Sequence, residues 1–207
     1  WQRKVCADFM SVRIGETPSK SNCKGRNYFQ CSFDDCRILY GRNASSKARA
    51  FETFDAGYDN GMLDKILDTL KDKNVKASFF VTGDFIKRFP NLVLRIFHEG
   101  HSVCNHSYSH KKITSMSKDE LDKDLKKLED EYYKLTGDEM IHYFRPPEGE
   151  FDRTSLLTLK NLGYKTIFWS IAYKDWVTDK QSGMDYCVKT IMDNLHNGAI
   201  ILMHSVS

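Results

Sequence analysis

From Phe51 onward, the chain alternates short apolar runs with segments in which apolar residues recur at helical spacing. The short runs, rich in β-branched and aromatic residues as strands are, cover 51–55, 77–81, 101–105, 142–145, 166–170 and 199–204. The helical segments cover 62–73, 92–98, 117–137, 154–162 and 184–195. Strand followed by helix, repeated about six times, predicts an α/β fold with a parallel sheet and helices outside it. An open doubly wound sheet and a closed or distorted barrel fit this alternation equally well.

The first 50 residues show neither a helical nor a strand period. We therefore expect an atypical, irregular segment over 1–50, ahead of a single domain over 51–207. We interpret 1–50 as foreign to the fold that follows, as a fusion or a mistranslated frame would be. Four cysteines fall in this segment without the C-x₂-C pairs typical of zinc modules, and a zinc site and two disulfides both remain open for them: Cys6, Cys23, Cys31 and Cys36. Cys104 and Cys187 lie in apolar contexts and are interpreted as small buried residues.

The composition excludes several classes of protein. Hydrophobic residues make up 41% and charged residues 29%, which is ordinary for a globular domain. The net charge of +3 is small and the lysines are mixed with acidic residues, so we expect no nucleic-acid partner. No run approaches the roughly 18 apolar residues of a membrane span, and no secretory leader stands at the start. We expect a monomer.

Polar residues gather where the predicted strands end. Asp55, His106, Arg145, Ser170 and His204 all stand at or just past the carboxyl end of one of them. In parallel α/β folds, ligands and chemistry collect at that edge of the sheet. These positions therefore predict one site.

The segment His106-Ser-Tyr-Ser-His110 predicts a metal site. Two imidazoles four residues apart meet on one face if a helical turn follows the strand, and this suits a divalent ion. Two unrelated surface histidines are the alternative. The position directly after a strand favours the metal.

Three further motifs carry candidate catalytic groups. Asp55 in Thr-Phe-Asp-Ala-Gly can serve as a general base, although Asp-x-Gly is also ordinary turn chemistry. Arg145 in Arg-Pro-Pro-Glu-Gly can orient a carboxylate, and the prolines stiffen a loop whose backbone N–H could face an oxyanion; a rigid surface turn is the alternative. His204 paired with Asp175 can act as a general acid, and Trp176 offers a flat wall for a sugar or an acetyl group.

Taken in order, these motifs resemble the five motifs of NodB-type polysaccharide deacetylases, carbohydrate esterase family 4. The similarity runs from about Phe51 to the last residue. TFDAGYDNG, NHSYSH, RPPEGEF, WSIAYKDW and GAIILMHSVS look most like the branch that deacetylates N-acetylmuramic acid in peptidoglycan. Those enzymes contribute to muramic δ-lactam formation in the spore cortex. The resemblance implies a distorted (β/α) barrel with its site at the C-terminal mouth, and a hydrolase that acts on linear amide bonds, outside the cytoplasm, on glycan strands of the cell wall.

The resemblance also implies a role for each matching residue. His106 and His110 would hold the metal, Asp55 would be the base, and Arg145 would orient Asp55. Asp175 would tune His204 as the acid. The remaining implied positions contact the substrate through an oxyanion-binding N–H or the acetyl pocket: Glu148, Gly149, Trp176 and Leu202.

This sequence departs from the family pattern at three places. Ala56 stands where most members have a second aspartate that binds the metal, so the implied zinc, manganese or magnesium ion would rest on two imidazoles and be held weakly. Glu148 replaces a frequent tyrosine, although its implied role belongs to the backbone. The chain stops soon after His204, so we expect a deacetylase domain, 51–207, that is truncated at its C-terminal end.

Three functional hypotheses remain open. The first is an active deacetylase. The second is a peptidoglycan-binding domain that kept the groove but lost its metal with Ala56. The third treats 1–40 as a small cysteine-based binding module.

Overall fold

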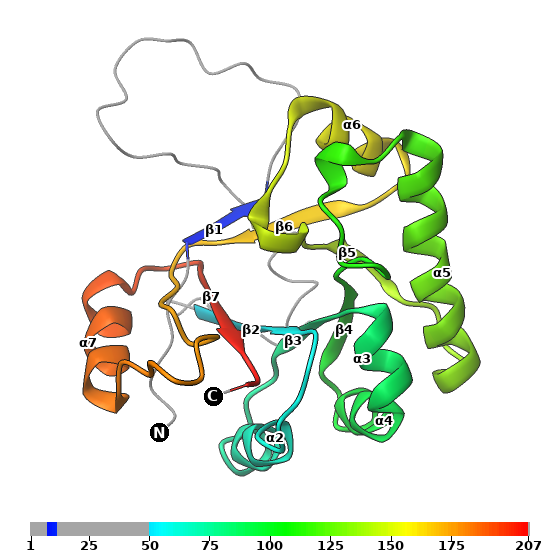
Figure 1. Cartoon of the computed structure of the whole chain (residues 1–207). Coiled ribbons are helices and arrows are strands. Elements are labelled where there is room, and N and C mark those ends of the chain that lie inside the picture. The colour runs from blue at the N-terminus through cyan, green and yellow to red at the C-terminus, as the bar shows by residue number, and fades with distance from the viewer. Residues whose placement is uncertain (1–7, 12–49, 207) are drawn as a thin grey trace, which may run out of the picture.

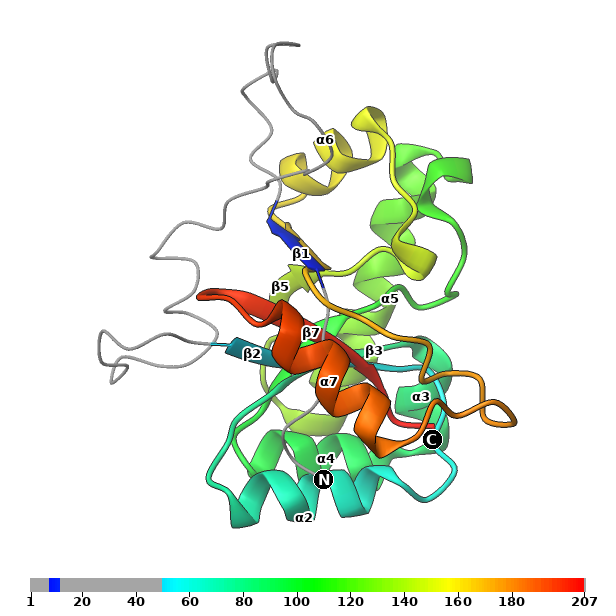
Figure 2. The ribbon, with the colours of Figure 1, turned by 90° about the vertical axis from the view of Figure 1, so that its left-hand side faces the viewer.

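The computed structural model describes residues 8–11 and 50–206, and Figures 1 and 2 show it from two directions. The strands are β1 (Asp8–Ser11), β2 (Ala50–Ala56), β3 (Ser78–Val81), β4 (Ser102–Asn105), β5 (Ile141–Phe144), β6 (Lys165–Trp169) and β7 (Ala199–His204). The helices are α2 (Leu63–Asp72), α3 (Gly83–Arg88), α4 (Pro90–His98), α5 (Lys118–Thr136), α6 (Arg153–Asn161) and α7 (Met184–Asn194). Two 3₁₀ turns, η1 (Ile113–Ser115) and η2 (Pro147–Gly149), lie in the connections.

Strands β2 to β7 run parallel in the order β6-β5-β4-β3-β2-β7, and β1 adds to β6 in the antiparallel sense. The sheet curls until its two ends meet. Just past β6, Ile171 forms a parallel bridge with Ile201 of β7, and its carbonyl accepts from the N–H of Leu202. The fold is therefore a nearly closed six-stranded barrel, as one of the two predicted architectures requires, and the open doubly wound sheet is wrong.

Each barrel strand contributes one buried residue to the interior. These residues form a single apolar cluster: Phe51, Phe80, Cys104, Tyr143, Ile167 and Ile200. Cys104 is a free thiol whose pKa burial raises to about 12, so the prediction of a small buried residue is confirmed. The interior is thus a packed core, and polar groups can gather only at its ends.

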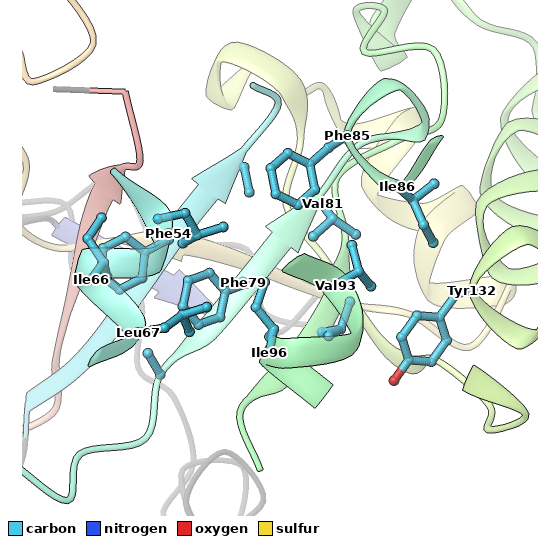
Figure 3. Close-up of a cluster of buried hydrophobic side chains, with 14 of the residues drawn as sticks. Phe54, Ile66, Leu67, Phe79, Val81, Phe85, Ile86, Val93, Ile96 and Tyr132 are labelled. Atoms are coloured by element: carbon cyan, nitrogen blue, oxygen red, sulfur yellow. The ribbon is translucent and has the colours of Figure 1, made fainter. Parts of the chain in front are cut away.

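A second core lies between the outer face of the barrel and the helices (Figure 3). Phe54 of β2 and Phe79 of β3 stack with ring centroids 4.9 Å apart. Ile66 and Leu67 of α2 cover them, because the helical spacing of that segment places its apolar residues on one stripe. Full burial of each such side chain stabilises the fold by about 1.5–3 kcal/mol. In Figure 1 the helices surround the sheet on its outer side.

The predicted helices are confirmed to within two residues at their ends. Ser117 caps α5 by accepting from the N–H of Glu120, and the Glu120 carboxylate accepts from the N–H of Ser117 in return. Gly137 ends α5 in the left-handed conformation, at φ 78°. Helix α3 was not predicted, because six residues are too few to show a period; it begins where Thr82 accepts from the N–H of Phe85.

Within 8–11 and 50–206, no helix is long and apolar enough to cross a bilayer. The expectations for the four N-terminal cysteines, for the module at 1–40 and for most of 1–50 fall outside the described residues. Only the backbone pairing of β1 is described there, and it joins β1 to the barrel at β6.

Candidate active site

Arg145 follows β5 and is completely buried at the carboxyl end of the barrel. Its guanidinium donates to Asp55 Oδ1 (2.5 Å), to Thr53 Oγ1 (2.9 Å), and more weakly to the carbonyls of Ile167 and Phe168. Its charged group also lies 4.0 Å from the centre of the Phe80 ring. Arg145 therefore ties β2, β3, β5 and β6 together around one carboxylate.

Asp55 is the last polar residue of β2, and its two carboxylate oxygens face different partners. Oδ1 accepts from Arg145, while Oδ2 lies 3.5 Å from His106 Nε2. Burial alone would raise the pKa of Asp55, but the positive charge of Arg145, with His106 and His204, holds it below its ordinary value. Asp55 is thus ionised at neutral pH, with one oxygen turned toward an imidazole.

His106 and His110 form an aromatic pair whose ring centres are 5.0 Å apart. The helical turn on which the predicted pairing was conditional is not formed: 106–110 is a loop in which Ser107 and His110 have positive φ of 68° and 53°. A helical turn is therefore not needed to bring the two rings together. Non-glycine residues in this conformation cost about 1–3 kcal/mol each and cluster at functional sites.

The proton position on His106 follows from its hydrogen bond. Nδ1 lies 2.8 Å from the carbonyl oxygen of Arg145, and because a carbonyl only accepts, Nδ1 carries the proton. Burial lowers the pKa of His106 to about 4, so its ring is neutral. Nε2 then carries a lone pair on the side of the ring near Asp55, and a neutral imidazole nitrogen of this kind is the form that binds metals.

The side chains present fit a divalent ion, but only a loosely held one. His106 and His110 can offer two ring nitrogens. In the described part of the chain, no three His, Cys, Asp or Glu side chains gather as a metal-binding group. Ala56 stands where the family resemblance implies a third, aspartate ligand. It is fully buried within the apolar cluster under α2 to α4.

His204 ends β7 directly beside Asp55, since the two residues are register partners on neighbouring parallel strands. Asp175 is buried and binds His204 twice, through Nδ1 and through the backbone N–H, both at 2.7 Å. Burial alone would lower the pKa of His204, but the hydrogen bond and charge of Asp175, with Asp55, hold it above its ordinary value. Trp176, 47% exposed, stands edge-on over the His204 ring at 5.3 Å.

The Arg-Pro-Pro-Glu-Gly loop forms η2 next to Arg145. Glu148 has a positive φ of 57°, and its side chain points outward to Lys112 at 3.2 Å. No acceptor lies against the backbone N–H of Glu148 among the described residues, whereas those of Gly149 and Glu150 donate to Pro146 and Pro147. A Cβ at Gly149 would lie 2.5 Å from the Trp169 ring, so that position requires glycine. Leu202 is buried in the cluster between β7 and α7.

Ser170 does not join the other strand-end residues. Its hydroxyl lies 2.9 Å from His196 Nε2 and accepts from the N–H of Ile200, at the start of β7. The barrel is sheared where it closes, so the end of β6 meets the beginning of β7 and not its carboxyl end. Sequence reasoning treated all strand ends as level and was wrong here.

Sequence reasoning also missed Asp124, which lies on α5. Its carboxylate accepts from Ser107 Oγ (2.7 Å), the N–H of Tyr108 (2.8 Å) and the N–H of Ser109 (3.1 Å). In sequence it is one of many acidic residues on a charged helix surface, and no signal distinguishes it.

Comparison with known proteins finds relatives that are named polysaccharide deacetylases. A profile described as polysaccharide deacetylase matches residues 42–167. The peptidoglycan-N-acetylmuramic acid deacetylase PdaA of Bacillus subtilis is 43% identical over 155 residues, which cover 75% of this chain and 59% of that protein. The chain thus spans 59% of the length of PdaA and 57% of the length of a deacetylase from Bacillus cereus, which is less than two thirds of either relative.

Solved structures agree. The structure of Bacillus subtilis PdaA, a family 4 carbohydrate esterase, matches with a TM-score of 0.74 and 34% identity, over 100% of this chain and 83% of that one. A family 4 pseudoenzyme from Bacillus anthracis matches with a TM-score of 0.71 and 30% identity, over 78% of this chain and 56% of that one. Because the profile covers more than half of the sequence and the barrel agrees with these structures, the chain belongs to the polysaccharide deacetylase family, carbohydrate esterase family 4.

Proposed function

We propose that this protein hydrolyses the N-acetyl group of an amino sugar in peptidoglycan. The observation that carries the proposal is the pairing of Asp55 with His204. They are register partners on adjacent strands, each is held by its own oppositely charged partner, and their pKa values shift in opposite directions. Two titratable groups driven apart in this way are typical of a base and an acid that share one reaction.

Asp55 is proposed as the base. An amide resists attack by neutral water, so a water proton must leave as the oxygen approaches the carbonyl carbon. Asp55 Oδ2 can take that proton, because Arg145 occupies Oδ1 and keeps the group ionised. The buried guanidinium also prevents the carboxylate from rotating.

His106 and His110 are proposed to hold a divalent ion through their ring nitrogens. A zinc, manganese or magnesium ion bound there would polarise the acetyl carbonyl and lower the pKa of a bound water. The neutral state of His106 and its bond to the Arg145 carbonyl prepare its Nε2 for this role. With Ala56 beside them, the two imidazoles are expected to bind the ion weakly.

His204 is proposed as the acid. An amine leaves poorly as an anion, so the nitrogen must gain a proton as the C–N bond breaks. Asp175 favours the protonated form of His204 by raising its pKa, and it fixes the ring through Nδ1. The N–H of Glu148 would donate to the developing oxyanion, an interaction of about 3 kcal/mol, while Gly149, Trp176 and Leu202 would border the acetyl group.

The proposed substrate is the N-acetylmuramic acid of a glycan strand, at the cell wall and outside the cytoplasm. The name of PdaA and the motif resemblance support this choice over N-acetylglucosamine. A relative from Bacillus cereus, 36% identical, is named for the latter sugar, so the family contains both.

Acetate release from purified peptidoglycan, with zinc supplied, tests the proposal. His106→Ala is expected to abolish release because the ion loses one of two ligands, while circular dichroism shows that the barrel still folds. His98→Ala on α4 serves as the matched control and should release acetate like the wild type. Equal release by both variants would contradict the assigned metal role.

A binding domain without activity is the second candidate, favoured by the buried Ala56 and by the pseudoenzyme among the similar structures. It predicts that the wild type sediments with peptidoglycan but releases no acetate with any of the three metals. The same assay therefore separates the two functions.

A further inference from the structure

We infer that Asp124 is a positioning residue that fixes His110 against His106. The inference rests on the proposed function, because it concerns the pair to which a metal role is given. We call residues 106–110 the histidine loop. Asp124 belongs to α5, outside every motif described above, and touches neither histidine ring.

The carboxylate of Asp124 accepts hydrogen bonds from three consecutive residues of the histidine loop. Oδ2 accepts from Ser107 Oγ and from the N–H of Tyr108, and Oδ1 accepts from the N–H of Ser109. Hydrogen bonds to a carboxylate are stronger than those between neutral groups. These bonds offset the cost of the positive φ angles at Ser107 and His110.

A relay leads from this carboxylate to His110. The hydroxyl of Ser107 donates to Asp124 and accepts from the backbone N–H of His110 at 3.1 Å. Asp124 therefore orients the one hydroxyl that holds the backbone of His110. Without that anchor, the loop loses the contact that sets the direction of the exposed second imidazole.

Other residues hold His106 and the carbonyl of Tyr108. The contacts of Asp124 therefore bear on His110 and not on His106. His106 is held by Arg145 O, and its N–H donates to Val81 O. Tyr108 O accepts from the N–H of Gly83 at 3.1 Å. Loss of Asp124 should leave Ser107 Oγ and the N–H groups of Tyr108 and Ser109 without their acceptor, while His106 stays in place.

Asp122 provides a matched control. It lies two residues earlier on the same helix, is also half-buried, and bonds Lys126 at 2.8 Å on the protein surface. Asp124→Asn replaces one acceptor oxygen by an NH₂ group that meets donors, whereas Asp122→Asn weakens only a surface ion pair.

Two measurements test the inference. Amide hydrogen exchange should become faster at Tyr108 and Ser109 in Asp124→Asn and stay unchanged in Asp122→Asn. Zinc binding by titration calorimetry should weaken about 10–100-fold in Asp124→Asn, as outer-shell changes do, with no change in Asp122→Asn. If Asp124→Asn does not fold, Ser107→Ala breaks the same relay and should weaken zinc binding in the same direction.

The outcomes distinguish this inference from the proposed function. Exchange rates and zinc affinity equal to those of Asp122→Asn would overturn the role of Asp124, even if the wild type is an active deacetylase. If the wild type binds no zinc, the metal role fails, and the exchange rates alone decide whether Asp124 fixes the loop. In that case too, amide exchange rates in Asp124→Asn equal to those of the wild type would overturn the role of Asp124.

Discussion

At the scale of single residues, the site separates two titratable groups that lie side by side. Asp55 and His204 occupy the same register on β2 and β7, yet Arg145 stabilises the charge of one and Asp175 the charge of the other. The pKa of each is therefore shifted toward the protonation state that its proposed role requires. Neither state would follow from burial alone, because burial disfavours both charges.

The pH dependence of the reaction tests the effect of Asp175 on the pKa of His204. His204 must be protonated to act as the acid, so activity is expected to fall as pH rises through the raised pKa of His204. Asp175→Asn removes the charge that contributes most to raising this pKa, and leaves the smaller contribution of Asp55 and the burial that lowers it. The alkaline limb of the kcat/KM profile should then move to lower pH, with a loss of up to about 100-fold at neutral pH.

Asp179→Asn is the control for this profile, because Asp179 lies exposed in the same connection. It should leave both limbs in place. An unshifted alkaline limb in Asp175→Asn would show that another group supplies the proton.

At the scale of elements, the site depends on loops that helices hold from outside the barrel. The histidine loop lies between α5, which supplies Asp124, and α3, which supplies Gly83. A Cβ at residue 83 would lie 2.4 Å from Tyr108 Cδ2 and 2.5 Å from Tyr108 O. The glycine is thus required by close approach of the loop backbone and not by its φ.

Gly83→Ala should therefore destabilise the protein despite the better helix propensity of alanine. Overpacking against backbone costs about 1–3 kcal/mol, which exceeds the gain of up to about 1 kcal/mol expected from alanine in a helix. Urea unfolding measures the difference. Gly57→Ala is the control, because the nearest atom to its Cβ would be Thr82 Cγ2 at 3.8 Å, and its stability should change by less than about 0.5 kcal/mol. Equal stability of the two variants would mean that the histidine loop moves away from residue 83 at no cost, and would contradict this prediction.

At the scale of the whole molecule, Arg145 belongs both to the interior of the barrel and to the candidate active site. It is completely buried and its guanidinium reaches residues of β2, β3 and β6. Removing one partner of a buried ion pair costs about 3–5 kcal/mol, because the other charge is left unpaired. The group that orients the proposed base therefore also joins β2, β3 and β6 in the interior of the barrel.

The sequence predicted the strands and the longer helices because their periods follow from which face is buried. Ile66, Leu67 and Phe54 illustrate this, since each lies on the stripe or face that its spacing indicates. The strand-helix alternation alone left barrel closure open, because closure depends on the contact of Ile171 with Ile201; the family resemblance implied the barrel, and that prediction is confirmed. The same shear removes Ser170 from the site, and the role of Asp124 requires a loop geometry that residue spacing does not encode.

The central claim is that Asp55, the two histidines of the loop and His204 form one hydrolytic site. Mass spectrometry of peptidoglycan fragments, before and after incubation with the wild type and with Asp55→Asn, tests it most directly. The account predicts the mass loss of one acetyl group from fragments that contain N-acetylmuramic acid, with the wild type alone. Fragments left intact by the wild type in the presence of zinc, manganese or magnesium, or equal loss with Asp55→Asn, would contradict it.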